Sequence, residues 1–306
     1  FEDVQNRVMK LIGDPETRYR EDPVRMLRAV RLAAKLGFRI DDASAAPLPA
    51  LAPLLREAAP ARLFEECLKL FLSGHAAESF LGLERHGLLD ALLPETAAAL
   101  KANRSGALRN MVLEGLRGTD ARVAADEPVS PAFLFAVLLW PAYCRALIAL
   151  QAQGVHPAEA QRRAADRVTV HQLEVIALPR RFSLPMQEIW LLQARFSQRK
   201  RVGRLLAHPR FRAAFDFLVL RQAASPDHAG EVAFWRDAQH DASLAGAGGT
   251  GFDGDGDAAP EGDDLLDGDA DPDAGKGARA PRRRRRRRHP VGGNNGGNDG
   301  GQSGVA

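Results

Sequence analysis

The stretch YREDPVRMLRAVR, residues 19–31, has the spacing of an amphipathic helix that continues to about Leu36. Asp22 can cap this helix with Pro23 at its first position, and Gly37 can end it. At about 100° per residue, one face is apolar and the opposite face is basic. The apolar face holds Met26, Leu27, Val30, Ala33 and Ala34, and the basic face holds Arg28, Arg31 and Lys35.

The rest of the sequence to about residue 240 repeats this helical pattern, without convincing strand alternation. Glycines and prolines punctuate the predicted helices. These cover about 43–57, 61–73, 76–86, 106–124, 131–151, 157–176, 184–199, 210–224 and 230–240. The predicted fold is therefore all-α. The most apolar run, PAFLFAVLLW at 131–140, is half the roughly 20 residues of a membrane span, which favours a buried helix. No membrane association is expected.

Composition changes sharply after residue 241. Gly, Asp and Ala dominate, followed by seven consecutive arginines, Arg282–Arg288, and a Gly/Asn-rich end. Too few apolar side chains remain to offset the entropy of ordering, so residues 241–306 are predicted to be a disordered tail. Cys67 and Cys144 are the two cysteines, which indicates neither a disulfide framework nor a zinc site and fits a reducing, cytoplasmic location.

The segment Glu21-Asp22-Pro23-Val24-Arg25 has two interpretations. Asp22 and Arg25 lie on one helical edge, where a carboxylate and a guanidinium could hydrogen-bond to the edge of a nucleobase. Alternatively, Asp22 only caps the helix and Glu21 pairs with Arg25 at i, i+4, worth a few tenths of a kcal/mol. The spacing alone favours the second interpretation.

Two motifs in order strengthen the first interpretation. LIGDPETRYREDPVRMLRAVRLAAKLGF (11–38) resembles the junction between head and neck in class II nucleotidyltransferases, the family of bacterial poly(A) polymerases and tRNA CCA-adding enzymes. PARLFEECLKLF (60–71) resembles the second neck motif of that family, through Arg62, Glu66 and Lys69. The resemblance covers roughly residues 1–240. Later stretches, including residues 82–94, 131–140 and 208–221, and the arginine-rich extension resemble the poly(A) polymerase branch.

The resemblance implies domains and roles for individual residues. Residues 1–20 would end the catalytic head, 21–75 would form a helical neck, and 76–240 a helical body. Asp22 and Arg25 would contact the base of the incoming nucleotide, with Arg28 as a further nucleotide contact. Glu21, Arg62 and Glu66 would brace the neck, and an Arg62–Glu66 pair at i, i+4 would suit that role.

Nucleotidyl transfer needs carboxylates that hold two Mg²⁺ ions. In the resembled family they lie on a strand of the head beside a Gly-Ser turn, and no such strand precedes residue 20. We therefore expect no catalytic residue and no metal ligand in this chain. The expectation is a fragment whose N-terminal head is missing, with Mg²⁺ bound by that head and ATP as substrate.

Basic segments predict contacts with RNA. Arg31 and Lys35 would touch phosphates, as would Arg199, Lys200, Arg201 and Arg204, which lie between Phe196 and Phe211. A solvated face over core phenylalanines is the alternative for the second group. The run of seven arginines near the C-terminus cannot pack, but it would release counterions on RNA. Its members are Arg282, Arg283, Arg284, Arg285, Arg286, Arg287 and Arg288.

The sequence therefore predicts the neck, body and tail of an enzyme that adds AMP from ATP to RNA 3′ ends without a template. RNA 3′ ends would be its partners, with RNA-decay or helicase proteins as further ones. Two alternatives remain. A tRNA CCA-adding enzyme shares both motifs, and a non-catalytic helical RNA-binding module would need no head.

Overall fold

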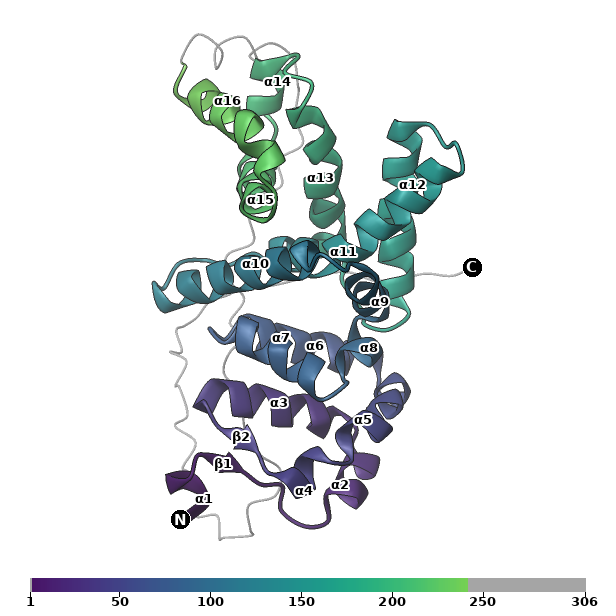
Figure 1. Ribbon diagram of the computed structural model, residues 1–306, viewed down its shortest axis with the longest axis vertical. Helices are drawn as coiled ribbons and strands as arrows, with labels where there is room; N and C mark the ends of the chain where they lie inside the picture. The colour runs from purple at the N-terminus through teal and green to yellow at the C-terminus, as the bar shows by residue number, and fades with distance from the viewer. Residues whose placement is uncertain (1, 242–306) are drawn as a thin grey trace, which may run out of the picture. The chain divides into compact units, whose positions relative to one another are not determined.

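The computed structural model describes residues 2–241, all within one compact unit that is almost entirely helical (Figure 1). The predicted all-α fold is confirmed over these residues. The predicted disordered tail, with Arg282–Arg288, lies outside them. The first elements are α1 (Glu2–Gln5), β1 (Val8–Met9), α2 (Pro15–Glu21), α3 (Val24–Leu36), β2 (Arg39–Ile40), α4 (Asp42–Ala45), α5 (Leu48–Leu51), η1 (Ala52–Glu57) and α6 (Pro60–Phe71).

The remaining described elements are helices. They are α7 (Ala76–Arg85), α8 (Leu89–Leu92), α9 (Pro94–Ala102), α10 (Ala107–Ala124), α11 (Pro131–Ala152), α12 (Pro157–Leu173), α13 (Arg180–Phe196), α14 (Val202–Leu206), α15 (Phe211–Ala224), η2 (Pro226–His228) and α16 (Ala229–His240). Helices α1, α2, α8, α9 and α14 and the 3₁₀ turn η2 were not predicted.

The sequence around the first motif forms two helices. The Asp14 carboxylate accepts a hydrogen bond from the Thr17 amide at 2.8 Å and caps α2. Asp22 ends α2, and α3 begins at Val24 with Pro23 as its N-terminal neighbour. The predicted cap by Asp22 is thus only a turn contact, in which its carboxylate accepts from the Val24 amide at 3.2 Å. Gly37 ends α3 in the left-handed conformation, as predicted.

Two short strands were not predicted. Strand β1 pairs with β2 in parallel, with Val8 opposite Arg39 and Met9 opposite Ile40. Each strand has two residues, which is too short for an alternating pattern to be visible in the sequence. The pair ties the segment before α2 to the segment after α3.

The single helix predicted over 43–57 is broken into α4, α5 and the 3₁₀ turn η1. Pro47, Pro49 and Pro53 fall within this range, and each lacks the amide that a helix interior needs. The prolines instead stand at or next to the first positions of the short helices.

Helices α3, α6 and α7 pack on one another, as the lower half of Figure 1 shows. Gly82 of α7 makes this approach possible, because a Cβ built there would lie 2.7 Å from Cγ1 of Val30 on α3. The faces that meet are apolar, and the buried side chains include Leu27, Leu70 and Phe80. Packing therefore holds the first motif on α3 beside the second motif on α6.

Helix α11 lies at the centre of the larger core and packs against α9, α10, α12 and α13. By length and hydropathy it could cross a membrane, but 67% of its most apolar window is buried inside the fold. That burial confirms the predicted core helix. The same core contains Tyr19 and Phe217, so side chains from both sides of the predicted neck–body boundary pack together. The boundary itself stays a prediction.

A second core joins α13, α15 and α16, with Phe196, Phe211 and Trp235 at its centre. The Trp235 indole donates to the Phe196 carbonyl at 2.7 Å. Helix α13 spans Arg180–Phe196 rather than the predicted 184–199, because Pro185 is accommodated inside the first turns of the helix. Helix α16 matches its predicted range.

Candidate functional site

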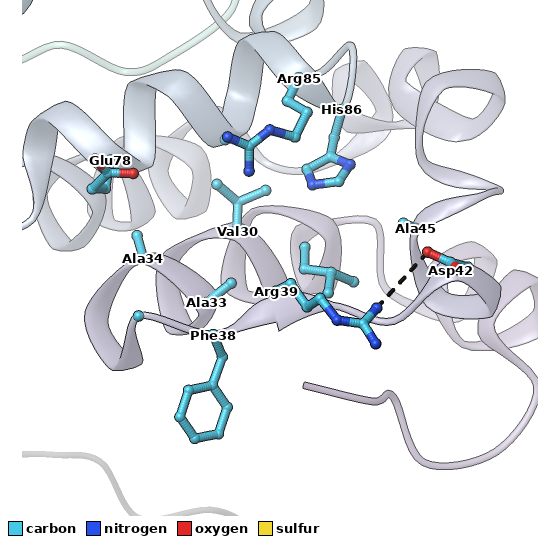
Figure 2. A pocket seen from close by; sticks show the side chains of 13 residues that line it. Val30, Ala33, Ala34, Phe38, Arg39, Asp42, Ala45, Glu78, Arg85 and His86 are labelled. Atoms are coloured by element: carbon cyan, nitrogen blue, oxygen red, sulfur yellow. Dashed lines mark ion pairs between the residues drawn. The ribbon is translucent and has the colours of Figure 1, made fainter. Parts of the chain in front are cut away.

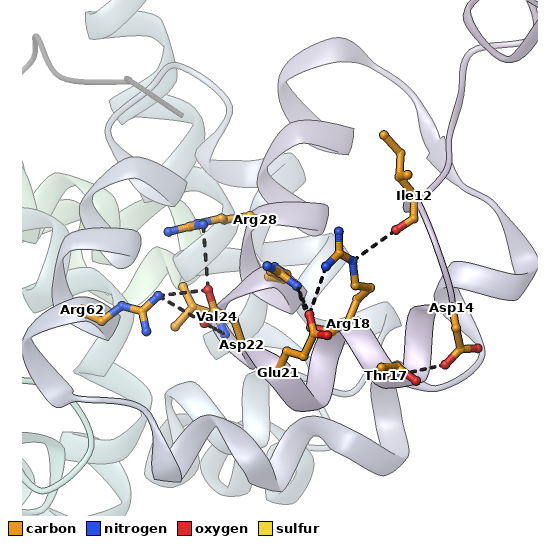
Figure 3. A network of polar contacts seen from close by, with 10 residues as sticks. Ile12, Asp14, Thr17, Arg18, Glu21, Asp22, Val24, Arg28 and Arg62 are labelled. Atoms are coloured by element: carbon orange, nitrogen blue, oxygen red, sulfur yellow. Dashed lines mark hydrogen bonds and ion pairs between the residues drawn. The ribbon is translucent and has the colours of Figure 1, made fainter. Parts of the chain in front are cut away.

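The first motif forms a network of charged side chains where α2 meets α3 (Figure 3). Glu21 accepts hydrogen bonds from Arg18 at 3.1 Å and from Arg25 at 2.9 Å. These hydrogen bonds, that from Arg25 first, lower the pKa of Glu21. Arg25 also donates to the Arg18 carbonyl at 3.2 Å. The i, i+4 pair expected between Glu21 and Arg25 is therefore present, and it holds Arg25 against the end of α2.

Asp22 is bound from a different side. Both of its oxygens accept from Nη2 of Arg62 on α6, at 3.1 and 3.0 Å, and Arg28 lies 4.0 Å away. The Asp22 side chain is only 18% exposed. The predicted Arg62–Glu66 pair is wrong, because Arg62 reaches to Asp22 in the α2–α3 turn instead of along its own helix. The contact links the two motifs directly.

Glu66 is the second link between α6 and α3. It is buried, and its carboxylate accepts from Nε of Arg31 at 2.6 Å, with Nε of Arg28 3.8 Å away. Arg31 was predicted to contact phosphates from the basic face, but its side chain is only 14% exposed and pairs with Glu66. Arg28 and Lys35 remain on the outer face. A buried carboxylate needs such a partner, so the pair fixes the register of the helices.

The contacts between the two motifs hold a surface on which the polar side chains of Asp22 and Arg25 are fixed in position. Arg62 and Glu66, predicted to brace the neck, contact Asp22 in the α2–α3 turn and Arg31 on α3, and Glu21 fixes Arg25. Asp22 and Arg25 are held by different partners and do not bond to each other through their side chains in the described structure. Each keeps unused hydrogen-bonding capacity, because a guanidinium has five donors and a carboxylate about four acceptor positions.

A pocket of about 520 Å³ lies on the other side of α3, between β2 and α7 (Figure 2). Its floor is made of small apolar residues that include Val30, Ala33 and Gly82. Arg85 and His86 come from the end of α7. Arg39 comes from β2, and its guanidinium extends toward Asp42, 4.0 Å away. Burial, with the Arg85 charge beside it, lowers the pKa of His86. This pocket was not predicted from the sequence, since its residues are adjacent only in space.

The basic segment after α13 is exposed, as the structure places Arg199, Lys200, Arg201 and Arg204. The guanidinium of Arg199 lies 5.0 Å from the ring centre of Phe234 and donates to the Gly230 carbonyl. Phe196 and Phe211, the aromatic residues on either side of this segment, are buried in the second core. They cannot stack on bases, so the alternative of a charged face over core phenylalanines is confirmed for these two rings.

No group of three or more His, Cys, Asp or Glu side chains between residues 2 and 241 is arranged to hold a metal ion. The two thiols are buried or half-buried, and burial raises the pKa of both Cys67 and Cys144. The described residues therefore do not form the two-ion centre that nucleotidyl transfer needs.

Two family models match the chain. One, described as "Probable RNA and SrmB- binding site of polymerase A", covers residues 37–100. The other, "Polymerase A arginine-rich C-terminus", covers residues 153–289. The first contains Arg39, Arg62 and Glu66, and the second contains Arg199–Arg204 and the arginine run.

Curated relatives agree with these matches. Poly(A) polymerase I of Salmonella typhi is 43% identical over 224 residues, which are 72% of this chain and 48% of the relative. Poly(A) polymerase I of Haemophilus influenzae is 37% identical over 240 residues, 77% of this chain and 53% of the relative. A CCA-adding enzyme of Limosilactobacillus reuteri is 45% identical over 72 residues, which are 24% of this chain and 18% of that enzyme.

The chain spans about half the length of the poly(A) polymerases it matches. The match to the CCA-adding enzyme is shorter, which agrees with a more distant relationship. Both family models and the long matches point the same way, and the chain belongs to the bacterial poly(A) polymerase family over the RNA-binding and arginine-rich C-terminal parts of its members.

Proposed function

We propose that this chain forms the base-selecting and RNA-binding part of an enzyme that adds AMP from ATP to RNA 3′ ends without a template. The observation that carries the proposal is the match along the C-terminal part of relatives named poly(A) polymerase I. The ion-pair network of the two motifs supports it, because it holds Asp22, in the α2–α3 turn, and Arg25, on the first turn of α3, in place through Arg62 and Glu21. Rigid support is what selection of one base requires.

Asp22 and Arg25 would read the base through the hydrogen-bonding positions that their partners leave free. Arg25 keeps donors after bonding to Glu21 and to the Arg18 carbonyl. Asp22 keeps acceptor positions after bonding to Arg62. A donor and an acceptor side by side match the donor and acceptor edge of adenine. Arg28, exposed and near both Asp22 and Glu66, would contact the nucleotide beyond the base.

ATP is the proposed substrate and Mg²⁺ the proposed metal. The residues described between 2 and 241 do not fit that metal, so no step of the transfer is assigned to them. The carboxylates that hold it would belong to a segment equivalent to the part of the relatives outside the match.

RNA would lie along the exposed cations. Lys35, Arg28, Arg199, Lys200, Arg201 and Arg204 are exposed and would contact phosphates. The arginine run 282–288 would add to them. Arg39 and Arg85 join this set, since both flank a pocket within or beside the matched RNA-binding range. The description of the same family model names SrmB beside RNA, which supports a protein partner in addition to RNA. The proposed location of both is the cytoplasm.

The test joins this chain to the part of the Salmonella typhi relative that precedes the match. The chimera and the chain alone are incubated with a 5′-labelled RNA, Mg²⁺, and ATP or CTP separately. Long ladders with ATP alone, from the chimera and not from the chain, are the expected result. Ladders that need both CTP and ATP on tRNA ends would instead support a CCA-adding enzyme, which the shorter match favours as the second candidate. If the chimera binds RNA but adds no nucleotide, the remaining alternative is a non-catalytic RNA-binding module.

A further inference from the structure

A second pocket, of about 340 Å³, lies between α11, α13 and α15 and is lined by Tyr143, Arg221 and His228 among others. Its walls include Trp140, Cys144 and Trp190. It is separate from the motif network and from the pocket beside α7, because no lining residue is shared. Its volume is at the small end of ligand pockets, which span roughly 300–1,000 Å³.

Arg221 supplies the charge of this pocket. Its guanidinium lies 5.2 Å from the ring centre of Trp140 and donates to Oε1 of Gln193 at 3.2 Å. It lies 2.9 Å from Nε2 of His228, whose Nδ1 is 3.1 Å from Glu231. No carboxylate of the described residues lies within ion-pair distance of Arg221. Burial lowers the pKa of this guanidinium, although an arginine stays charged.

The partners of Arg221 are themselves fixed. The buried Gln193 amide donates to the carbonyls of Ile189 and Ala214, both at 3.0 Å, so its oxygen can only point toward Arg221. His228 accepts from Arg221 on one nitrogen when its other nitrogen donates to Glu231. Two of the five guanidinium donors are used, and the others remain for a ligand. The hydrogen-bond partners of Arg221 are thus the Gln193 amide and the His228 ring, and the carboxylate of Glu231, which contacts the far side of that ring, also lines the pocket.

Tyr143 supplies an unused hydroxyl. The residue is 2% exposed and is stacked between Trp140 and Trp190, at 5.1 and 5.0 Å between ring centres. Its phenol has no hydrogen-bond partner among residues 2–241, although it lines the pocket. This hydroxyl is therefore available to bond to a ligand or to water inside the pocket. Tyr19, the other tyrosine of the chain, is buried too, but its phenol donates to the Ser44 carbonyl at 3.0 Å.

We propose that this pocket binds a phosphate group, held by the Arg221 guanidinium and the Tyr143 hydroxyl. A fixed guanidinium without a carboxylate partner prefers an oxyanion that accepts several hydrogen bonds, and phosphate does so. Most of the polar lining lies in the matched arginine-rich C-terminus. The phosphate would come from RNA or from a free nucleotide. The choice of RNA rests on the proposed function, whereas the phosphate site does not.

The test uses the whole chain, with inorganic phosphate, AMP and a short unstructured oligoadenylate as probes. Trp140 and Trp190 are two of the three tryptophans, so tryptophan fluorescence reports on the pocket. Sodium chloride at equal ionic strength is the blank. Phosphate and AMP should change the emission and compete with the oligoadenylate. If only the oligoadenylate binds, the phosphate source is the RNA backbone, and if only phosphate and AMP bind, the source is a free nucleotide.

The two tyrosines give a matched pair of variants. Tyr143→Phe should weaken binding of the probes about tenfold, because a hydrogen bond to a charged group is lost. Its melting temperature should not fall, since no protein contact is lost. Tyr19→Phe should lower the melting temperature and leave probe binding unchanged. Arg221→Lys, which keeps the charge but not the planar group, should also weaken binding.

Two results would overturn the proposal: no probe changes the emission of the unaltered chain, or Tyr143→Phe binds every probe as tightly as the unaltered chain does. Failure of the proposed function is seen separately. A chimera that adds no AMP, while the tyrosine pair behaves as expected, removes the polymerase proposal and leaves the phosphate site standing.

Discussion

At the scale of residues, Asp22 and Glu66 show how two carboxylates join helices that are far apart in the sequence. Asp22 of the α2–α3 turn binds Arg62 of α6, and Glu66 of α6 binds Arg31 of α3. Helix α6 supplies the guanidinium of the first contact and the carboxylate of the second. The more exposed of them is worth little alone, since Arg62 is 49% exposed. The buried one carries more of the coupling.

Glu66→Gln should therefore destabilise the fold. Removing this carboxylate leaves the Arg31 guanidinium buried without its counter-ion, which costs on the order of 3 kcal/mol. Glu65→Gln is the matched control, because Glu65 is adjacent and exposed. Urea unfolding of both variants measures the difference. Equal unfolding midpoints for the two variants would show that the Arg31–Glu66 pair contributes nothing to stability.

The variant Arg25→Ala, made in the chimera, tests whether Arg25 hydrogen-bonds to the base of ATP. Loss of its donors should raise the KM for ATP about tenfold, the cost of one charge-assisted hydrogen bond, while the affinity for RNA stays the same. Arg20→Ala is the control, since Arg20 lies on α2, is exposed and pairs only with Glu16 in the described structure. Steady-state rates at varied ATP and a binding titration with RNA measure the two effects. If the KM for ATP rises and the affinity for RNA falls together, Arg25 contacts the bound RNA instead of the base of ATP.

At the scale of elements, close approach of α10 to α11 and α15 depends on Gly115. A Cβ built there would lie 2.6 Å from Cγ1 of Val137 and 2.9 Å from Cδ2 of Leu220. Gly115→Ala should therefore cost about 1–3 kcal/mol in the free energy of unfolding. Gly118→Ala, on the same helix but with open space around it, should raise stability by up to about 1 kcal/mol. Thermal unfolding would contradict this packing if both variants shifted in the same direction.

Glu95 links α9 to α11 and α12 through Arg145 and His171. Burial would raise the pKa of Glu95, but the hydrogen bonds from Arg145 and His171 outweigh it, and the pKa lies below its ordinary value of 4.5. A carboxylate whose pKa is lowered by folding stabilises the fold above its unfolded pKa. That contribution is lost as the pH falls from about 5 through the folded pKa.

Glu95→Gln should reduce stability near pH 7 by about 1 kcal/mol and should make stability fall less steeply below pH 5. Urea unfolding at several pH values measures both effects. Glu159→Gln is the control, because Glu159 forms an exposed i, i+4 pair with Arg163 on α12. An unchanged acid slope in Glu95→Gln would mean that other carboxylates cause the acid sensitivity.

How far the sequence predicts such features depends on whether they are local. The long helices follow from periodicity and from caps such as Gly37, because these signals lie within one element. The single helix predicted over 43–57 is wrong, because the prolines of this region matter more than its apolar spacing. The Asp22–Arg62 and Arg31–Glu66 contacts join residues 40 and 35 positions apart. Only packing of α3 on α6 decides that Arg31 faces Glu66 and not solvent.

At the scale of the whole molecule, charge is divided unevenly. The chain has a net charge of +3, yet seven arginines adjoin one another at 282–288, so neutralising them would bring the net charge to −4. Within the described residues most cations of the motif network are paired with carboxylates. The long-range attraction to a polyanion should therefore come mainly from the arginine run and the exposed Arg199–Arg204 segment.

Replacing the seven arginines 282–288 by glutamine should flatten the salt dependence of RNA binding. For single strands, the slope of log K against log salt is about −0.7 per phosphate neutralised, so loss of seven contacts should reduce its magnitude by up to about 5. Fluorescence anisotropy with a labelled oligoadenylate at several salt concentrations measures the slope. Affinity should fall most at low salt, where counterion release favours binding most strongly.

The control changes Arg104, Arg117 and Arg122 to glutamine. All three are exposed around α10 and lie outside both matched family ranges. If overall charge alone attracts RNA, neutralising them should flatten the slope in proportion, by up to about 2. If RNA follows the arginine run, the control should keep the original slope while the tail variant loses most of it. The comparison therefore separates a local contact at residues 282–288 from the general attraction of a basic protein to a polyanion.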